Sequence, residues 1–380
     1  MIKKKLAIIC AGESQIPLAL KAKEMDIETH CFAWDKENHN QCKGIADYFH
    51  PISIIEKDKI VEICKEIGIN GVTSIITSYA VPTVCYVAEE LGLIGNRYED
   101  ALIAGNKYSA RQAFIKNRVH SPRFAVVQDG VEPDLTGFKF PVIVKPTDRN
   151  STIGVSKAYS KEELRDTIQR SQQFSFSGQA IIEEYIEGFE VSVDTISCKG
   201  KHYILAIKER EMGTGVYGDV KIAGHWPADL PSDIQEKIKT ETQKALDAIN
   251  YQFGASNTEF RITEEGDVLI IEANPRMAGE QSHILMQLYN GYDIVKGVID
   301  VALGQFEEPV ISETKFSGAY FLTKQTEWVR QVIENRENDP DIIHAEMSDE
   351  QLPELRWVGS RRGYFVYQSN QRRRWGPPSK

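Results

Sequence analysis

Two neighbouring segments of the chain place carboxylate and amide side chains inside apolar strand patterns. They read Thr258-Glu259-Phe260-Arg261 and Ile270-Ile271-Glu272-Ala273-Asn274-Pro275-Arg276, separated by a charged turn at 263–267. On adjacent antiparallel strands Glu259 and Glu272 would project from one face, and Asn274 shares that face because side chains alternate along a strand. The apolar run 268–271 favours a buried strand over a solvated acidic hairpin, and a buried carboxylate requires a partner.

These side chains have the chemistry of a metal site. Hard oxygen ligands suit Mg²⁺, which proteins usually hold through one or two carboxylates together with substrate phosphates. We therefore predict that Glu259, Glu272 and Asn274 bind Mg²⁺ or Mn²⁺. Arg276 follows at once and supplies a permanent cation beside the metal.

Composition limits the classes of partner. The chain has 380 residues, enough for two or three domains, and a formal net charge of −10, which argues against general binding to nucleic acid or to anionic membranes. It contains no apolar run of about 18 residues, so we expect no transmembrane helix. The six cysteines are scattered without a Cys-x-x-Cys pair, which favours free thiols and a cytoplasmic protein.

The first 95 residues alternate strand and helix patterns. Expected strands at 6–10, 27–33 and 71–77 alternate with expected helices at 16–25, 60–67 and 81–91, which predicts a parallel sheet. Ligands bind such sheets at the carboxyl ends of the strands, so Glu13 in the first turn is a candidate substrate contact. A tight connecting turn without a ligand role is an equal alternative, and the turn lacks the full glycine pattern of a dinucleotide site.

A lysine ends the next buried strand. Lys145 follows Val142-Ile143-Val144 and precedes a polar loop from Thr147 to Gly154, so it is either an edge residue or a ligand contact. A fixed cation beside main-chain N–H groups is what a triphosphate requires. The later segment 180–194 reads as an apolar strand, a carboxylate-rich connection with a bend at Gly188, and a second strand. The connection is either a surface hairpin or a binding site for adenosine.

Taken together, these segments resemble the ATP-grasp superfamily over residues 6–304. The resemblance implies an α/β and α+β protein with an N-terminal parallel α/β (pre-ATP-grasp) domain at 1–95. A two-subdomain ATP-grasp fold would follow at 96–190 and 191–310, with a small C-terminal subdomain at 311–380.

The resemblance also implies the roles of individual residues. ATP would be bound by Lys107, Lys145, Ser151, Thr152, Gly154, Glu183, Glu184, Ile186, Glu190 and Lys208. Of these, the two first-named lysines would hold the phosphates, Glu183 and Ile186 would meet adenine mainly through main-chain groups, and Glu190 would bind the ribose. Glu259, Glu272 and Asn274 match the metal triad. Arg276 and Lys145 would be catalytic, with the arginine steadying an acyl phosphate.

The segment 272–280, Glu-Ala-Asn-Pro-Arg-Met-Ala-Gly-Glu, is similar to the L-amino-acid ligase branch. There Gly279, Glu280 and Arg276 would shape the substrate pocket. Glu280 would take an α-amino group, although a role in a salt-bridged helix cap is equally plausible. The Gln-Val-Glu-His typical of biotin carboxylases does not follow Asn-Pro-Arg, which weighs against bicarbonate and biotin.

The resemblance implies an ATP- and Mg-dependent carboxylate–amine ligase that forms an acyl phosphate and releases ADP and phosphate. Its partners would be ATP, a small carboxylate and an amine, with a homodimer left open. Two alternatives remain: a purine-biosynthesis-type or carboxyphosphate-forming relative, and a nucleotide-binding regulator without turnover.

Two further regions have open interpretations. The segments 208–215 and 223–227 flank a glycine-rich stretch that would either order when ATP and substrate bind or form a plain surface loop. Near the C-terminus we expect a strand at 318–322 and a last strand at 364–367 in a small subdomain. We expect the arginine-rich end, 372–374, to be solvated.

Overall fold

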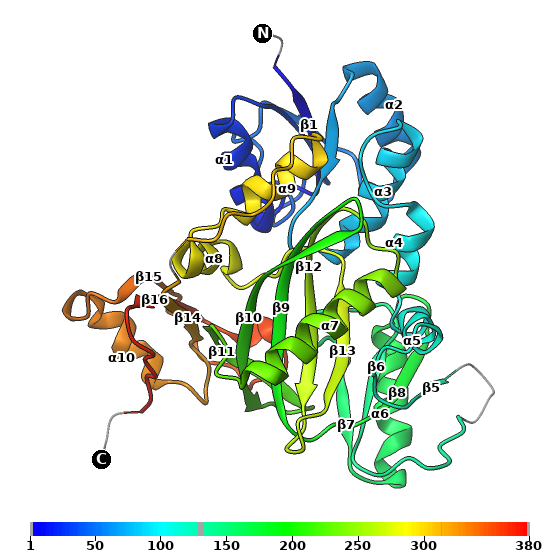
Figure 1. Ribbon diagram of the computed structural model, residues 1–380, viewed down its shortest axis with the longest axis vertical. Helices are drawn as coiled ribbons and strands as arrows, with labels where there is room; N and C mark the ends of the chain where they lie inside the picture. The colour runs from blue at the N-terminus through cyan, green and yellow to red at the C-terminus, as the bar shows by residue number, and fades with distance from the viewer. Residues whose placement is uncertain (1–2, 128–132, 313, 378–380) are drawn as a thin grey trace.

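The structure is a computed structural model that describes residues 3–127, 133–312 and 314–377. Across these residues the strands form three sheets, one parallel and two antiparallel, with helices packed on each (Figure 1). The predicted mixture of α/β and α+β architecture is confirmed.

The N-terminal sheet is parallel, as predicted. Its strand order is β3 (Tyr48–His50), β2 (Glu28–Phe32), β1 (Lys5–Ile9) and β4 (Gly71–Thr73). The connecting helices are α1 (Ile16–Glu24), α2 (Lys57–Ile67) and α3 (Val81–Glu90). Short 3-10 turns at Glu13–Gln15 and Ser78–Ala80 lie beyond the carboxyl ends of β1 and β4, where the sequence predicts a ligand cleft.

Two helices lead into a second sheet. After α4 (Tyr98–Gly105) and α5 (Lys107–Lys116), the antiparallel order is β5 (Phe124–Val127), β8 (Ala180–Glu184), β6 (Val142–Pro146) and β7 (Ser156–Ala158). Helix α6 (Lys161–Phe174) packs against it through Leu164 and Ile168. Lys145 is therefore on an inner strand, because β6 pairs with both β7 and β8, and it is not an edge residue.

The long sheet has eight antiparallel strands. In order they are β13 (Val268–Asn274), β12 (Gly254–Ile262), β9 (Phe189–Cys198), β10 (Lys201–Thr214), β11 (Asp219–Trp226), β14 (Phe316–Phe321), β16 (Gly363–Ser369) and β15 (Ile342–Met347). Helix α7 (Ser232–Ala248) crosses one face (Figure 1). Further helices are α8 (Ser282–Asn290), α9 (Ile294–Ala302) and α10 (Trp328–Glu334), with 3-10 turns at Arg336–Asn338 and Val358–Ser360.

The long sheet corrects two expectations about local structure. Segments 208–215 and 223–227 lie largely in β10 and β11, so the residues read as a loop are mostly paired strands joined by a short turn at 215–218. The predicted last strand, at 364–367, is present in β16, but it pairs with β14 and so continues the long sheet beyond residue 310. The division into domains at residues 95, 190 and 310 stays a prediction.

The arginine-rich end is also different from the expectation. Arg373 pairs with Asp339 and Asp341 at 2.7 and 2.6 Å, and Arg374 pairs with Glu209 at 2.7 Å. The ring centroids of Trp375 and Tyr367 lie 4.5 Å apart, with the two ring planes tilted by 49°. The arginine-rich end therefore packs on the long sheet, because its guanidinium groups pair with carboxylates that are distant in the sequence.

No helix among the described residues combines the length and the apolar character needed to cross a membrane.

Candidate active site

A cavity of about 160 Å³ lies between the second sheet and the long sheet. Its lining brings together most of the residues that the resemblance assigns to ATP. These are Lys107, Lys145, Ser151, Thr152, Glu183, Glu184, Ile186 and Glu190. The carboxylates of Glu259 and Glu272 line the same cavity.

Lys107 and Lys145 reach this cavity from different elements. Lys107 is the first residue of α5, whose N-cap Asn106 accepts a hydrogen bond from the backbone N–H of Ser109 at 3.1 Å. Its ammonium lies 2.9 Å from Glu272 and donates to the carbonyl of Arg149 at 2.5 Å. The start of α5 is thus attached both to β13 and to the polar loop.

The polar loop after β6 has a constrained backbone. Ser151 and Thr152 have φ of 57° and 60°, in the left-handed region that L-residues rarely adopt, and both line the cavity. Gly154 has φ of 74°, and a Cβ there would lie 2.8 Å from Pro146 and from Phe174. Gly154 does not line the cavity; it allows the loop to turn back into β7.

A buried charge clamp supports Lys145. The carboxylate of Glu183 lies 2.7 Å from Lys145 Nζ and 2.9 Å from Arg111 Nε, and all three residues are buried. Burial raises the pKa of Glu183, but Arg111 and Lys145 outweigh it and the pKa is lowered. Burial lowers the pKa of Lys145, and Glu183 offsets this in part. The clamp fixes the ammonium of Lys145 at one position in the cavity.

The clamp engages the side chain of Glu183, and its predicted contact with adenine through main-chain groups stays a prediction. Its side chain is engaged with two cations, and its main chain lies in a strand paired on both sides, with Phe124 and Ile143 as register partners. Ile186 lies in the connection after β8, where no strand pairs with it. Gly188 makes that connection possible: its φ is 132°, and a Cβ would lie 2.0 Å from the carbonyl of Ile262.

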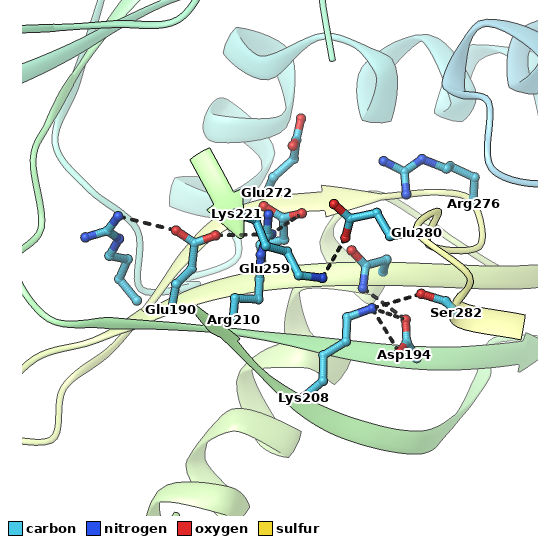
Figure 2. A network of polar contacts seen from close by, with 12 residues as sticks. Glu190, Asp194, Lys208, Arg210, Lys221, Glu259, Glu272, Arg276, Glu280 and Ser282 are labelled. Carbon is cyan, nitrogen blue, oxygen red and sulfur yellow. Dashed lines mark hydrogen bonds and ion pairs between the residues drawn. The ribbon is translucent and has the colours of Figure 1, made fainter. Parts of the chain in front are cut away.

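Alternating charges extend along the long sheet. Arg210 lies 3.1 Å from Glu190 and 2.5 Å from Glu259 (Figure 2). Arg261 joins Glu190 to Asp219 at 3.3 and 3.2 Å. Burial lowers the pKa of Arg210, but Glu259 and Glu190 outweigh it and raise the pKa. Glu190 therefore has two cationic partners that hold its orientation at the cavity.

The predicted metal ligands lie on paired strands. Glu259 is directly opposite Glu272 in the β12–β13 ladder, and Asn274 is opposite Asn257. The Nδ2 atom of Asn274 is buried and has no hydrogen-bond partner among the described residues. In those residues no cluster of three or more His, Cys, Asp or Glu side chains forms a metal site, so a metal here would depend on two carboxylates, an amide and a ligand of its own. Hard oxygen donors in this number fit Mg²⁺.

The other predicted residues divide into two groups. Arg276 donates to Ser78 Oγ at 3.2 Å and extends towards the side of the network that holds Glu272 and Glu280 (Figure 2). Lys208 is outside the cavity lining: its ammonium is 3.1 Å from Asp194 and 3.5 Å from Ser282. The position of Lys208 therefore gives no support to its assignment to ATP, because its ammonium pairs with Asp194 of β9 outside the cavity lining.

The three substrate candidates other than Arg276 lie near one another. Glu13 and Glu280 line a second cavity of about 580 Å³, and Gly279 precedes Glu280 in the turn before α8. Both oxygens of Glu280 are taken, by Lys221 and by Arg361, each at 2.6 Å. Glu280 therefore has the salt-bridged role that the sequence left open, and its contact with an amino group stays a prediction.

Comparison with known proteins matches one segment of the chain to a family model. The ATP-grasp domain family matches residues 138–284, the segment that contributes Lys145, Glu183, Glu190, Glu259, Glu272 and Arg276. This segment of the chain is similar to the ATP-grasp domain.

Among curated ATP-grasp relatives, D-alanine–D-alanine ligase of Geobacter sulfurreducens is 28% identical over 176 residues, 45% of this chain and 55% of the relative. Alanine–anticapsin ligase of Bacillus subtilis is 25% identical over 295 residues, 68% of this chain and 62% of the relative. The chain thus spans less than two thirds of the length of either relative.

Solved structures share the ATP-grasp fold over nearly the whole chain. The L-amino acid ligase from Bacillus licheniformis has a TM-score of 0.79 at 19% identity, covering 98% of this chain and 94% of that one. Phosphoribosylglycinamide synthetase from Anaerococcus prevotii has a TM-score of 0.76 at 23% identity, covering 97% and 95%. At these identities the likeness concerns the fold.

Several residues of the candidate site were not predicted from sequence. They are Arg111, Arg210, Lys221, Arg261 and Arg361, all cations that pair with carboxylates of the site. Arg210 and Arg261 carried a usable signal, because each interrupts a strand pattern next to a predicted site strand. Arg361 carried none, since it lies 81 residues from Glu280 in the chain.

Proposed function

We propose that this chain is an ATP- and Mg-dependent ligase that joins a carboxylate to an amine. One observation carries the proposal: Glu259 and Glu272 face each other across β12–β13, inside a cavity that also contains Lys107, Lys145 and Arg210. The cavity therefore brings carboxylates suited to a metal ion next to cations suited to phosphate groups. The ligases among the relatives support the choice of reaction class.

The chemistry follows from charge. A carboxylate is a poor acyl donor, and transfer of the γ-phosphoryl group to its oxygen releases ADP and makes an acyl phosphate. The amine then attacks the acyl carbon, phosphate leaves, and the nitrogen loses a proton. Catalysis of phosphoryl transfer is largely positioning and electrostatic stabilisation, and a bound Mg²⁺ neutralises phosphate charge.

The chain's own groups have separate tasks in this reaction. Lys107 and Lys145 hold the phosphates, the loop containing Ser151 and Thr152 covers them, and Glu190 binds the ribose. The connection at Ile186 meets adenine through main-chain groups. Arg276 stabilises the acyl phosphate, and Glu259, Glu272 and Asn274 hold the metal.

The test is ADP release with Mg·ATP across amino acids, singly and in pairs, with bicarbonate as a separate condition. We expect release that requires an amino acid, with the product identified by mass spectrometry. Bicarbonate-dependent release alone would favour a carboxyphosphate-forming enzyme. Tight ATP binding without ADP in any condition would favour a regulator without turnover.

A pair of variants tests the metal assignment in the same assay. Glu272→Gln removes one negative ligand and should lower Mg-dependent turnover by at least about 100-fold while the protein stays folded. Glu264→Gln, in the exposed turn of the same hairpin, should keep normal turnover. Near-normal activity of Glu272→Gln would contradict the metal site.

A further inference from the structure

The cations that line the candidate active site differ in whether a carboxylate neutralises them. They are Lys107, Lys145, Arg149, Arg210 and Arg261. Every one of them except Arg149 forms an ion pair with a carboxylate of the site, at distances between 2.5 and 3.2 Å. Arg149 forms no ion pair with any residue in the ranges that the structure describes. It is therefore the lining cation that is left to pair with an incoming anion.

Arg149 is held at the cavity through its main chain and through the face of its guanidinium group. Its carbonyl accepts a hydrogen bond from Lys107 Nζ at 2.5 Å, and its Cζ lies 4.1 Å from the ring centroid of Phe176. Stacking on a ring uses the face of a guanidinium and leaves its N–H groups available as donors. The Nε atom of Arg149 is buried and has no hydrogen-bond partner among the described residues, a state that an acceptor on a ligand would relieve.

The ring under Arg149 is itself fixed from two sides. The carboxylate of Asp148 accepts hydrogen bonds from the main-chain N–H groups of Phe176 and Ser177, at 3.1 and 2.8 Å. Asp148 is thus engaged with this turn and does not neutralise its neighbour Arg149. The ring of Tyr79 meets that of Phe176 edge to face, with the centroids 5.7 Å apart. These two rings form an aromatic platform that joins the polar loop to the N-terminal part of the chain.

Arg149 is linked to both ends of the proposed reaction. Through Lys107 it is linked to Glu272, which lies 2.9 Å from that ammonium. Through the aromatic platform it is linked to the turn at Ser78–Ala80, where Arg276 donates to a hydroxyl at 3.2 Å. In the proposed reaction Glu272 holds the metal and Arg276 stabilises the acyl phosphate. The phosphoryl group would therefore pass between the two regions that Arg149 connects.

We propose that Arg149 is a further catalytic residue, whose guanidinium pairs with the phosphoryl group while it is transferred, and that Phe176 is its positioning residue. The inference rests on the proposed ligase function. In the transfer step the bond from phosphorus to the ADP oxygen breaks while a bond from phosphorus to a carboxylate oxygen of the acid forms, and no proton moves. Charge spreads over three equatorial oxygens, which the paired donors of a planar guanidinium group suit.

Two other anions in the same cavity would give a different pattern of binding. If Arg149 held the diphosphate that remains on ADP, its loss would weaken ADP and ATP equally. If it held the carboxylate of the acid, its loss would raise KM for the acid and leave nucleotide affinity unchanged. Pairing with the transferred group alone affects turnover and the affinity for a triphosphate, but not the affinity for ADP.

The experiment compares nucleotides with and without that group. Calorimetry on the full chain measures the Kd of Mg·ADP and of Mg·AMP-PNP, a non-hydrolysable ATP analogue. ADP release with the amino acid that stimulates the wild type most gives kcat and both KM values. The variants are Arg149→Ala and Arg149→Lys, with Arg165→Ala in the exposed part of α6 as control. For the platform they are Phe176→Ala and Phe176→Tyr, with Tyr159→Ala, 62% exposed, as control.

The expected result separates turnover from ADP binding. Arg149→Ala should lower kcat at least about 100-fold and weaken the analogue at least about 5-fold, while the Kd of Mg·ADP changes less than about twofold. Arg149→Lys keeps the charge and should recover at least about 10-fold of kcat. Phe176→Ala should lower kcat about 10-fold with little change in KM for ATP, whereas Phe176→Tyr keeps the ring and should match the wild type. Both controls should also match it.

Three results would overturn the assignment of Arg149. They are a kcat of Arg149→Ala within about threefold of the wild type, equal losses of affinity for ADP and the analogue, and a raised KM for the acid with unchanged affinity for the analogue. If the wild type releases no ADP with any acid, the ligase proposal fails. The two Kd values then decide the assignment of Arg149 by themselves, because their measurement requires no acid.

Discussion

At the scale of residues, the candidate site consists of charges that compensate one another. Glu183 holds Lys145, Glu272 holds Lys107, and Glu190 and Glu259 hold Arg210. Groups fixed in this way need little reorganisation when phosphate charge arrives, which is the basis of electrostatic catalysis. Glu259 and Glu272 were predictable because they interrupt apolar strand patterns, whereas Glu183 and Glu190 were named only through the superfamily resemblance. Their pairing with cations from distant segments was not predictable.

The buried clamp predicts a large loss of stability. Glu183→Gln leaves the guanidinium of Arg111 and the ammonium of Lys145 buried without a carboxylate, at a cost of roughly 3–5 kcal/mol. Urea denaturation followed by circular dichroism measures it. Glu184→Gln, one residue on and only partly buried, is the matched control and should change stability by less than about 0.5 kcal/mol. Equal behaviour of the two variants would contradict the clamp.

The buried ammonium of Lys221 should make the free energy of unfolding depend on pH. Burial lowers its pKa from 10.5 to about 8, with Glu280 opposing the shift. Between pH 8 and 10.5 the unfolded state binds the extra proton, so this residue makes stability rise with pH in that window. The penalty for burying the charge is fully present below pH 8.

The measurement compares wild type with Lys221→Met in urea at pH 7, 8.5 and 10. Relative to the variant, the wild type should gain stability as pH rises, while Lys324→Met at an exposed site should show no such trend. A constant difference between wild type and Lys221→Met across the three pH values argues against the lowered pKa.

At the scale of elements, strand and helix periods located most of the structure. The parallel strands β1, β2 and β4 and the β12–β13 hairpin all lie where the patterns indicated. The main failure was β10 and β11, whose glycines and charges suggested a loop. Arg210 and Lys221 form ion pairs on the sheet, so the polar character of these segments did not indicate that they are paired strands.

The C-terminal end predicts a contribution to stability. Trp375 lies 4.5 Å from Tyr367 and 6.0 Å from Tyr320, and its main-chain N–H donates to the hydroxyl of Tyr320 at 3.1 Å. Trp375→Ala should cost about 1–2 kcal/mol because a partly buried ring is lost. Thermal denaturation measures the effect, with Trp357→Ala, 43% exposed, as a control expected near zero. A Tm unchanged by Trp375→Ala would mean that this end is solvated after all.

At the scale of the whole molecule, the site depends on parts joined by long-range contacts. Arg276 of the loop after β13 donates to Ser78 beyond β4, and α9 packs between the N-terminal helix α1 and the long sheet. The candidate active site and the second cavity therefore share a frame to which all three sheets contribute residues.

This arrangement predicts stabilisation by nucleotide. A non-hydrolysable Mg·ATP analogue at about 100 times its Kd should stabilise the fold by about 2.7 kcal/mol, because it binds only the folded state. Lys107→Ala should need at least about 10-fold more analogue for the same rise in Tm, whereas Lys116→Ala, exposed at the other end of α5, should match the wild type. Equal titrations for both variants would exclude Lys107 from the nucleotide site.

The sequence by itself determined the parallel N-terminal sheet, the hairpin carrying Glu259 and Glu272, and the superfamily resemblance. These depend on local periods and on residues close together in the chain, where the geometry of a strand or turn decides which side chains share a face. Only the tertiary structure decided that Glu183 is a buried clamp, that Glu280 is already paired, and that Glu13 and Glu346 line one cavity. Those relations join residues 38 to more than 300 positions apart, and no local pattern encodes which buried charge will neutralise which.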